Sequence, residues 1–170
     1  MIETINALNR RQFIERFGFL FDHSPWIIAQ VETMRPFASL EAMHKAMMTV
    51  VAHSGPEAQL ALLRAHPKLA DKAAIKAGLT PESAAEQASV GLDRLTSDEF
   101  GRFHELNEAY EARFGFPFII CVRLAGGKAG ILEAMQARLD LSPEAELQTA
   151  LTQVGEIVRL RLQDSVGVSP

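Results

Sequence analysis

Hydrophobic positions recur along this chain with the spacing of α-helices. Between Thr96 and Phe114 the aromatic and aliphatic side chains fall three or four residues apart, which places them on one face of a helix. Alternating apolar and polar runs joined by two-residue turns, the pattern of β-hairpins, are nearly absent. The pattern therefore predicts an all-α fold, a single compact helical bundle of about seven to nine helices.

Residues that start and stop helices divide the chain into the expected elements. Serine or threonine favours the N-cap, proline the first turn, and a residue that precedes proline disfavours helix. The spacings Ser54–Glu57 and Thr96–Glu99 each match a capping box. We expect helices over residues 9–20, 26–34, 39–51, 54–65 and 96–114, a short helix that starts at Thr80-Pro81, and helices over residues 128–139 and 143–165.

One apolar run does not fit a helix. The string FPFIICV, which includes Phe118–Val122, is too short for a helix of its own and is rich in β-branched residues. We interpret it as an extended, buried segment between two helices. No repeat, linker or change in composition separates one part of the chain from another, so residues 1–170 are expected to form one domain.

Composition narrows the class of protein. Hydrophobic residues make up 48% and charged residues 22% of the chain, as in ordinary globular proteins. The net charge of −4 and the lack of a Lys/Arg stripe argue against nucleic acid as a partner. No signal peptide, membrane-spanning run or peroxisomal signal is evident. With Cys121 as the single cysteine, a reducing compartment is expected, and we expect the protein in the cytoplasm, without a membrane partner.

Common catalytic motifs are missing. Neither GxxxxGK[ST] nor GxGxxG occurs, and no serine lies in a GxSxG elbow. The five histidines form no i, i+4 pair, so no metal site is expected, although scattered ligands can converge in space. Cys121 lies in an apolar run, where a thiol is usually inert.

His66 is the histidine whose position suggests chemistry. It precedes Pro67, so the helix before it has to end and the imidazole lies at the edge of a loop. From the residues alone, a histidine that caps the helix C-terminus is the commoner arrangement. The alternative is an acid–base residue that faces a cavity.

Three further groups are candidates for binding. Ser83, Glu86 and Gln87 share one face of the short helix at i, i+3 and i+4, where a solvated surface is the commoner arrangement. The main chain of the extended segment has no neighbouring strand to satisfy it, so it is available to a ligand, to water or to side chains. Arg159 and Arg161 can each clamp a carboxylate or form a surface ion pair.

Several strings in this order resemble one family. They are SPW at 24–26, RPF at 35–37, RAHPKLA at 64–70, the Ser83, Glu86 and Gln87 cluster, FGFPFIICV at 114–122 and RLRL at 159–162. Together they resemble the 2-oxo-4-hydroxy-4-carboxy-5-ureidoimidazoline (OHCU) decarboxylases of urate breakdown, over nearly the whole chain. Residues 71–79 are more apolar and alanine-rich than the polar linker expected there.

The resemblance implies an enzyme, an all-helical and commonly homodimeric carboxy-lyase that uses neither metal nor organic cofactor. Such an enzyme releases CO2 from OHCU to give (S)-allantoin, which is the last step of urate oxidation in purine catabolism. It assigns His66 as the acid–base residue, with Glu86 contributing to catalysis. The residues expected to bind the substrate are Pro67, Ser83, Gln87, Phe118, Ile119, Ile120, Cys121, Val122 and Arg159.

Two alternatives stay open at this point. A hydrolase or isomerase that acts on a related ureido or hydantoin ring would share the fold and the site. A helical interaction module would use the same strings structurally and would offer an apolar groove to a partner helix.

Overall fold

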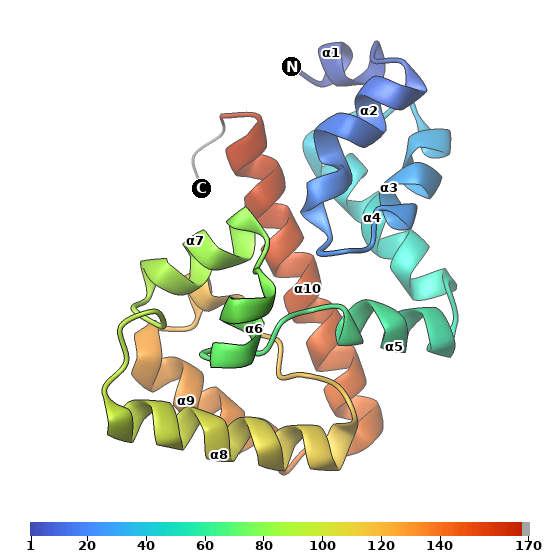
Figure 1. Cartoon of the computed structure of the whole chain (residues 1–170). Coiled ribbons are helices and arrows are strands. Elements are labelled where there is room, and N and C mark those ends of the chain that lie inside the picture. The colour runs from blue at the N-terminus through green and yellow to red at the C-terminus, as the bar shows by residue number, and fades with distance from the viewer. Residues whose placement is uncertain (168–170) are drawn as a thin grey trace. The chain divides into compact units, whose positions relative to one another are not determined.

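The computed structural model describes residues 1–167, apart from the side chain of residue 77. In this part of the chain there are ten α-helices and three 3₁₀ turns and no strand, so the predicted all-α fold is confirmed (Figure 1). The described chain divides into two compact units, one of residues 1–65 with the chain from Gly155 onward, and one of residues 66–154. A single domain therefore stays a prediction, and each unit is described by itself.

The first unit is built on short helices around an apolar core. They are α1 (Ile2–Asn6), α2 (Arg10–Phe17), η1 (Gly18–Leu20), α3 (Trp26–Val31), η2 (Glu32–Met34), α4 (Leu40–His53) and α5 (Pro56–Arg64), with the last part of α10 (Pro143–Ser165). α3 packs against α4. The side chains buried at the centre include Phe13, Phe17, Leu20, Ile27, Ile28, Val31, Met43 and Met47.

The second unit contains the candidate site. It is formed by α6 (Lys72–Ala77), α7 (Pro81–Ser89), α8 (Ser97–Phe114), η3 (Val122–Leu124), α9 (Gly127–Arg138) and the first part of α10. Tyr110 of α8 is fully buried and contacts the rings of Phe114, Phe116 and Phe118, with the last centroid 5.2 Å away. This aromatic cluster fixes the chain that follows α8 against the helix.

Most of the predicted helix ends are confirmed. Ser39, Thr80, Thr96 and Ser142 each accept a hydrogen bond from a main-chain N–H in the first turn of the helix that follows, as N-caps do. The capping box of Thr96 and Glu99 is present with both of its hydrogen bonds. After α8, residues 117–121 are neither helix nor strand, as predicted for the extended segment.

The predicted capping box at Ser54 is wrong. The Ser54 hydroxyl donates to the carbonyl of Val51 at 2.7 Å and so belongs to the end of α4. Gly55 precedes α5 with φ of +88°, a conformation that suits glycine and directs the chain away from α4. The short helices α1 and α6 were not predicted, because neither has a cap followed by a long apolar stripe.

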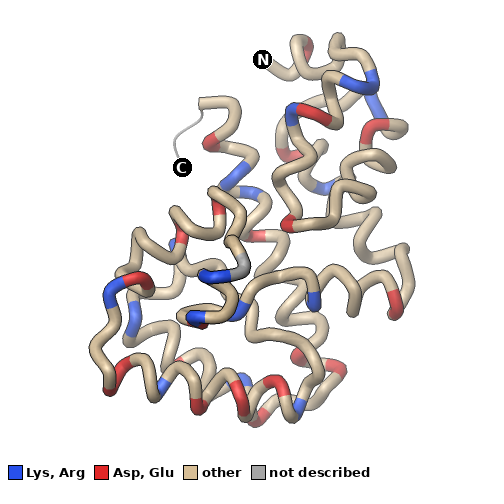
Figure 2. Tube along the Cα trace, viewed as in Figure 1, with Lys and Arg blue, Asp and Glu red and all other residues tan. Residues whose placement is uncertain are grey.

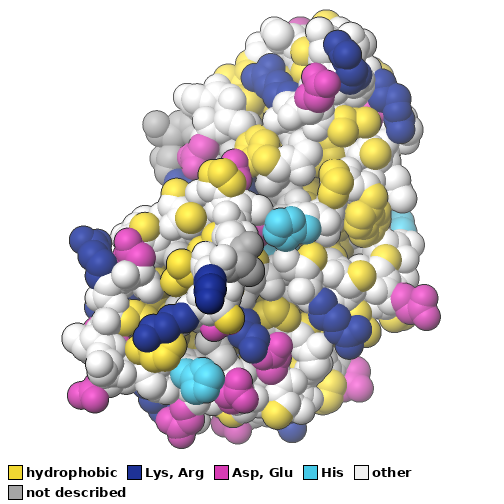
Figure 3. All heavy atoms as spheres, viewed as in Figure 1, with side chains coloured by type: hydrophobic (Ala, Val, Ile, Leu, Met, Phe, Trp, Pro, Cys, Tyr) yellow, Lys and Arg dark blue, Asp and Glu magenta, His cyan; other side chains and the backbone are white. Residues whose placement is uncertain are grey.

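The surface carries charges of both signs. Acidic and basic positions are interspersed along α8 in Figure 2, and the face drawn in Figure 3 shows no stripe of Lys and Arg among the described residues. None of the helices formed by residues 1–167 has the length and apolar character that crossing a bilayer requires.

Candidate active site

The loop that begins at His66 is buried and starts the second unit. α5 ends at Arg64, and Ala65 closes it with its own N–H bonded to the carbonyl of Ala61 at 3.0 Å. His66 follows with 8% of its surface exposed, and Pro67 is half-buried. A helix end before proline thus places an imidazole that is largely shielded from water at the start of the loop.

Two helices hold this loop through its main chain. The carbonyl of Leu69 accepts a hydrogen bond from the side-chain amide of Asn107 on α8, at 2.9 Å. The N–H of Ala70 donates to Oε1 of Gln87 on α7, at 3.2 Å. Ala70 has φ of +54°, a conformation that costs a non-glycine residue free energy and persists where neighbouring groups enforce it.

The predicted polar face of α7 is present. Thr80 caps the helix, Ser83 and Gln87 are buried, and Glu86 between them is half-buried. A carboxylate in this setting keeps one part in contact with water while it lies beside buried polar groups, which suits a group that binds N–H donors. The side chain of Gln87 also has the structural task of holding Ala70, which the sequence did not indicate.

The extended segment is fixed on both sides of Ile120. The carbonyl of Ile119 accepts a hydrogen bond from Nη1 of Arg138, at 2.7 Å, and the N–H of Cys121 donates to Oε1 of Gln153, at 2.9 Å. Ile120 is half-buried, and its own N–H and C=O have no hydrogen-bond partner within the described chain. The main chain of Ile120 is therefore available to a ligand in a segment whose neighbours are held in place.

Three of the predicted pieces meet in the second unit. Gln87 joins α7 to the loop of His66, and α7 packs against η3, which begins at Val122 at the end of the extended segment (Figure 1). The imidazole, the polar helix face and the extended main chain thus belong to one compact body. The residues that fix them, Asn107, Arg138 and Gln153, were missed by sequence reasoning because they lie on three helices with no shared motif.

The two candidate arginines lie in the first unit and differ in their surroundings. Arg161 is almost fully buried and donates to Asp22 at 3.0 Å and to the Leu20 carbonyl at 3.2 Å. Arg159 is about one-third exposed and pairs with Glu156 at 2.6 Å. Arg159 also lines a cavity of about 290 Å³, together with Leu40, Glu41, His44, Leu162 and Gln163.

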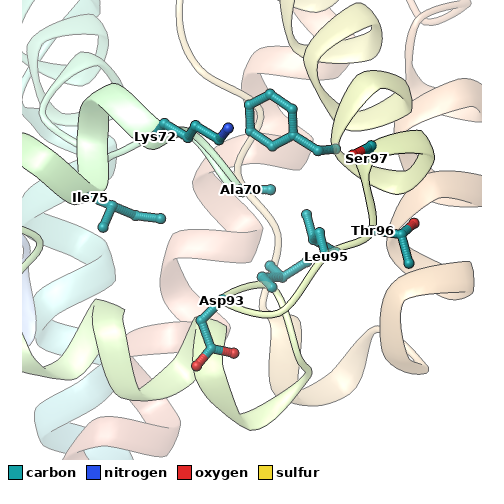
Figure 4. A pocket seen from close by; sticks show the side chains of 9 residues that line it. Ala70, Lys72, Ile75, Asp93, Leu95, Thr96 and Ser97 are labelled. Atoms are coloured by element: carbon teal, nitrogen blue, oxygen red, sulfur yellow. The ribbon is translucent and has the colours of Figure 1, made fainter.

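A second cavity, of about 240 Å³, lies beside the loop but does not include His66 or Glu86. Figure 4 shows Lys72 and Ile75 on one side of it and Thr96 and Ser97 on the other. The Lys72 amine lies 4.6 Å from the centre of the Phe100 ring. Within residues 1–167, no three His, Cys, Asp or Glu side chains lie close enough together to hold a metal ion.

An all-helical chain that places a buried imidazole, a half-buried carboxylate and accessible main-chain groups in one unit has the features of an acid–base enzyme for a small polar molecule. The sequence model of one family, described as OHCU decarboxylase, matches residues 6–163. This chain belongs to the OHCU decarboxylase family. The predicted family and its enzyme class, the carboxy-lyases, are thereby confirmed.

Two relatives match along nearly their whole length. A protein of Haloferax volcanii named 2-oxo-4-hydroxy-4-carboxy-5-ureidoimidazoline decarboxylase is 39% identical, with 96% of this chain and 94% of the relative covered. A protein of Mus musculus with the same name is 36% identical, with 96% of this chain and 91% of the relative covered. Such long matches cover the loop, α7 and the extended segment.

Two solved structures are similar. A crystal structure titled (S)-allantoin synthase superposes with a TM-score of 0.77 at 27% identity, and covers 97% of this chain; this chain spans 54% of that one. A structure of OHCU decarboxylase in the presence of (S)-allantoin gives a TM-score of 0.64 at 23% identity, with 85% of this chain and 93% of the other covered. The second similarity concerns the fold.

Proposed function

We propose that this chain removes CO2 from OHCU and forms (S)-allantoin, with His66 as the acid–base residue. One observation carries the proposal beyond family membership: the loop of His66 is held against the Ser83–Gln87 helix by the bond from Ala70 to Gln87. That bond connects the main chain of the loop that carries His66 with the helix that carries Glu86. General acid–base catalysis by a group placed in this way contributes roughly 10²–10⁴ in rate.

The reaction breaks the bond between the ring carbon and the carboxylate. CO2 leaves, and the electron pair passes into the conjugated C=N of the ring, whose nitrogen takes up a proton. This C=N acts as the electron sink that other decarboxylases take from a cofactor. The ring hydroxyl then loses its proton to become a carbonyl, and a proton is added to the neighbouring carbon. From the carboxylate form, one proton is taken up overall, and we assign its movement to His66.

The remaining residues would bind and orient the substrate. Glu86 accepts hydrogen bonds from ureido or ring N–H groups. Pro67, Ser83 and Gln87 contact the same side of the substrate as Glu86. The main chain of Phe118–Val122 pairs with the polar edge of the ring, with Ile120 offering an unpaired N–H and C=O. Arg159 clamps the carboxylate, which fixes the bond that breaks.

The first test is the reaction itself. Purified protein is mixed with OHCU made in place from urate by the two preceding reactions, and the decay and the optical activity of the product are followed. We expect faster decay with (S)-allantoin as the product, loss of this activity in His66→Ala, and full activity in the control His104→Ala, an exposed histidine of α8. Decay at the spontaneous rate with a racemic product would refute the proposal and leave the related ureido and hydantoin rings as substrates to test.

Glu86→Gln separates the two residues of the proposed chemistry. The amide keeps the size of the side chain but accepts fewer hydrogen bonds and carries no charge. We expect it to lower kcat/KM by about 10-fold or more; unchanged activity would remove Glu86 from the mechanism.

The homodimer and the cytoplasmic location stay predictions, and light scattering on the purified protein tests the first.

A further inference from the structure

A fully buried cluster of polar side chains lies directly behind the extended segment. Glu146 of α10 is 0% exposed, and Arg138 at the end of α9 is 8% exposed. Nε of Arg138 donates to the two carboxylate oxygens of Glu146 at 2.9 and 3.1 Å, and the Tyr110 hydroxyl also donates to Glu146. Burial and this hydrogen bond raise the pKa of Tyr110 far above its usual range, so the phenol stays a donor.

One hydrogen bond connects this cluster to the extended segment. Nη1 of Arg138 points to the carbonyl of Ile119 at 2.7 Å, and the guanidinium lies over the ring of Phe118 at 4.3 Å. Arg138 therefore contacts two consecutive residues, the aromatic face of Phe118 and the main-chain oxygen of Ile119. The carboxylate of Glu146 fixes the guanidinium in the plane that both contacts need.

Stability alone does not account for such a pair. Removing two charges from water costs several kcal/mol per ion, and apolar replacements of similar volume are often as stable or more stable. An apolar pair, however, cannot donate to the Ile119 carbonyl. The distinctive effect of the Arg138–Glu146 pair is therefore to set the position of the main chain at Ile119 and, through it, at Ile120.

We propose that Arg138 and Glu146 are positioning residues, which hold the main chain of Ile119 and Ile120 where it binds the substrate. The inference rests on the proposed function, since it concerns the same segment. Gln153 holds the other side at Cys121, so Ile120 lies between two fixed points. Without Arg138 the segment loses one of them, and the substrate is bound less tightly and in more than one orientation.

The test uses two variants, neither of which leaves an uncompensated charge in the interior. Arg138→Met/Glu146→Leu/Tyr110→Phe removes all three polar groups together, and Arg138→Lys keeps a cation beside Glu146 but loses the planar fork. The control is Arg113→Met, because Arg113 donates to a main-chain carbonyl of Leu141 at 2.8 Å on the exposed surface of the same unit. The KM for OHCU and the Kd for (S)-allantoin are measured for each.

We expect both variants to raise KM and Kd about 10-fold, as loss of one well-placed hydrogen bond does, and the control to change neither. A purely structural role would lower the folded fraction, which reduces the apparent kcat and leaves KM unchanged. Folded variants with unchanged KM and Kd would therefore overturn the proposal. If the triple variant fails to fold, Arg138→Lys decides the question alone.

A second measurement separates this proposal from the proposed function. If the unmodified protein does not act on OHCU, the proposed function fails, but hydrogen exchange of the Cys121 amide, whose N–H donates to Gln153, still reports the positioning role. We expect this amide to exchange at least about 10-fold faster in the two Arg138 variants than in the unmodified protein and in Arg113→Met. Equal rates would overturn the positioning role whatever the substrate.

Discussion

The side chain of Gln87 holds the main chain of Ala70. Its Oε1 accepts the Ala70 N–H at 3.2 Å, both residues are buried, and Ala70 has the uncommon φ of +54°. One hydrogen bond thus connects the helix that carries Glu86 to the loop that carries His66. The main chain of the loop is consequently tied to α7 by a hydrogen bond within the protein itself.

Replacing Gln87 by methionine should disturb both stability and activity. The buried N–H of Ala70 would lose its acceptor, which costs about 1–3 kcal/mol. We expect this loss in urea unfolding and a fall of about 10-fold or more in kcat/KM. The control is Gln136→Met, since Gln136 is exposed on α9 and its loss should cost no more than about 0.5 kcal/mol. Equal effects of the two variants would contradict the role of Gln87.

The two arginines of α10 should give opposite results. Arg161→Ala removes the guanidinium that pairs with the buried carboxylate of Asp22, and we expect a loss of about 3–5 kcal/mol of unfolding free energy. Arg159→Ala removes a partly exposed pair with Glu156, worth at most about 1 kcal/mol. Its kcat/KM should instead fall about 10- to 100-fold if Arg159 binds the substrate carboxylate. Full activity of a folded Arg159→Ala would indicate that Arg161, rather than Arg159, binds the substrate carboxylate.

Gly130 is expected to tolerate no side chain. A Cβ at this position would lie 1.8 Å from the carbonyl oxygen of Ala125, so the turn between η3 and α9 has to shift. Gly130→Ala should destabilise the protein by about 1–3 kcal/mol or more. Gly101→Ala in α8 meets nothing within 4 Å and should stabilise it by about 0.5–1 kcal/mol. Thermal unfolding of the two variants checks both signs.

The ion pair of Lys68 predicts a change of stability at alkaline pH. The hydrogen bond with Glu111, at 2.5 Å, raises the pKa of Lys68 above 10.5. A raised folded pKa means that the contribution is fully present below about pH 10.5 and is lost as the pH rises through the folded value. We expect Lys68→Met to cost up to about 1 kcal/mol at neutral pH.

The difference between Lys68→Met and the unmodified protein should then shrink above pH 10.5. Urea unfolding at several pH values measures it. Lys76→Met, which removes an exposed lysine of α6, is the control for the loss of one positive charge. A difference that stays constant with pH would mean that Lys68 acts through packing alone.

Local signals predicted most of the fold. Thr96 and Glu99 lie at the spacing of a capping box and form one, because the bonds involve residues of a single turn. Ser54 and Glu57 have the same spacing, but the Ser54 hydroxyl finds the carbonyl of Val51 in the helix before it. The same short motif fits the end of one helix or the start of the next, and the conformation of Gly55 decides between them.

The candidate site was predictable in part. The strings around His66, Glu86 and Ile120 identified segments that the second unit contains, since they lie within short stretches of sequence. Arg138, Glu146 and Gln153 were not identified, because their partners lie on other elements and no spacing indicates them. Arg159 and Arg161 lie about 200° apart around one helix, so a doublet in the sequence could not say which of them is buried.

The buried pair of Arg138 and Glu146 also limits how this sequence can change over generations. A substitution of either residue alone leaves an uncompensated charge in the interior, at a cost of about 3–5 kcal/mol, which is a large share of the stability of a small protein. The two codons are therefore expected to change together or not at all. Among descendants of this gene, an apolar residue at one position should be accompanied by an apolar residue at the other.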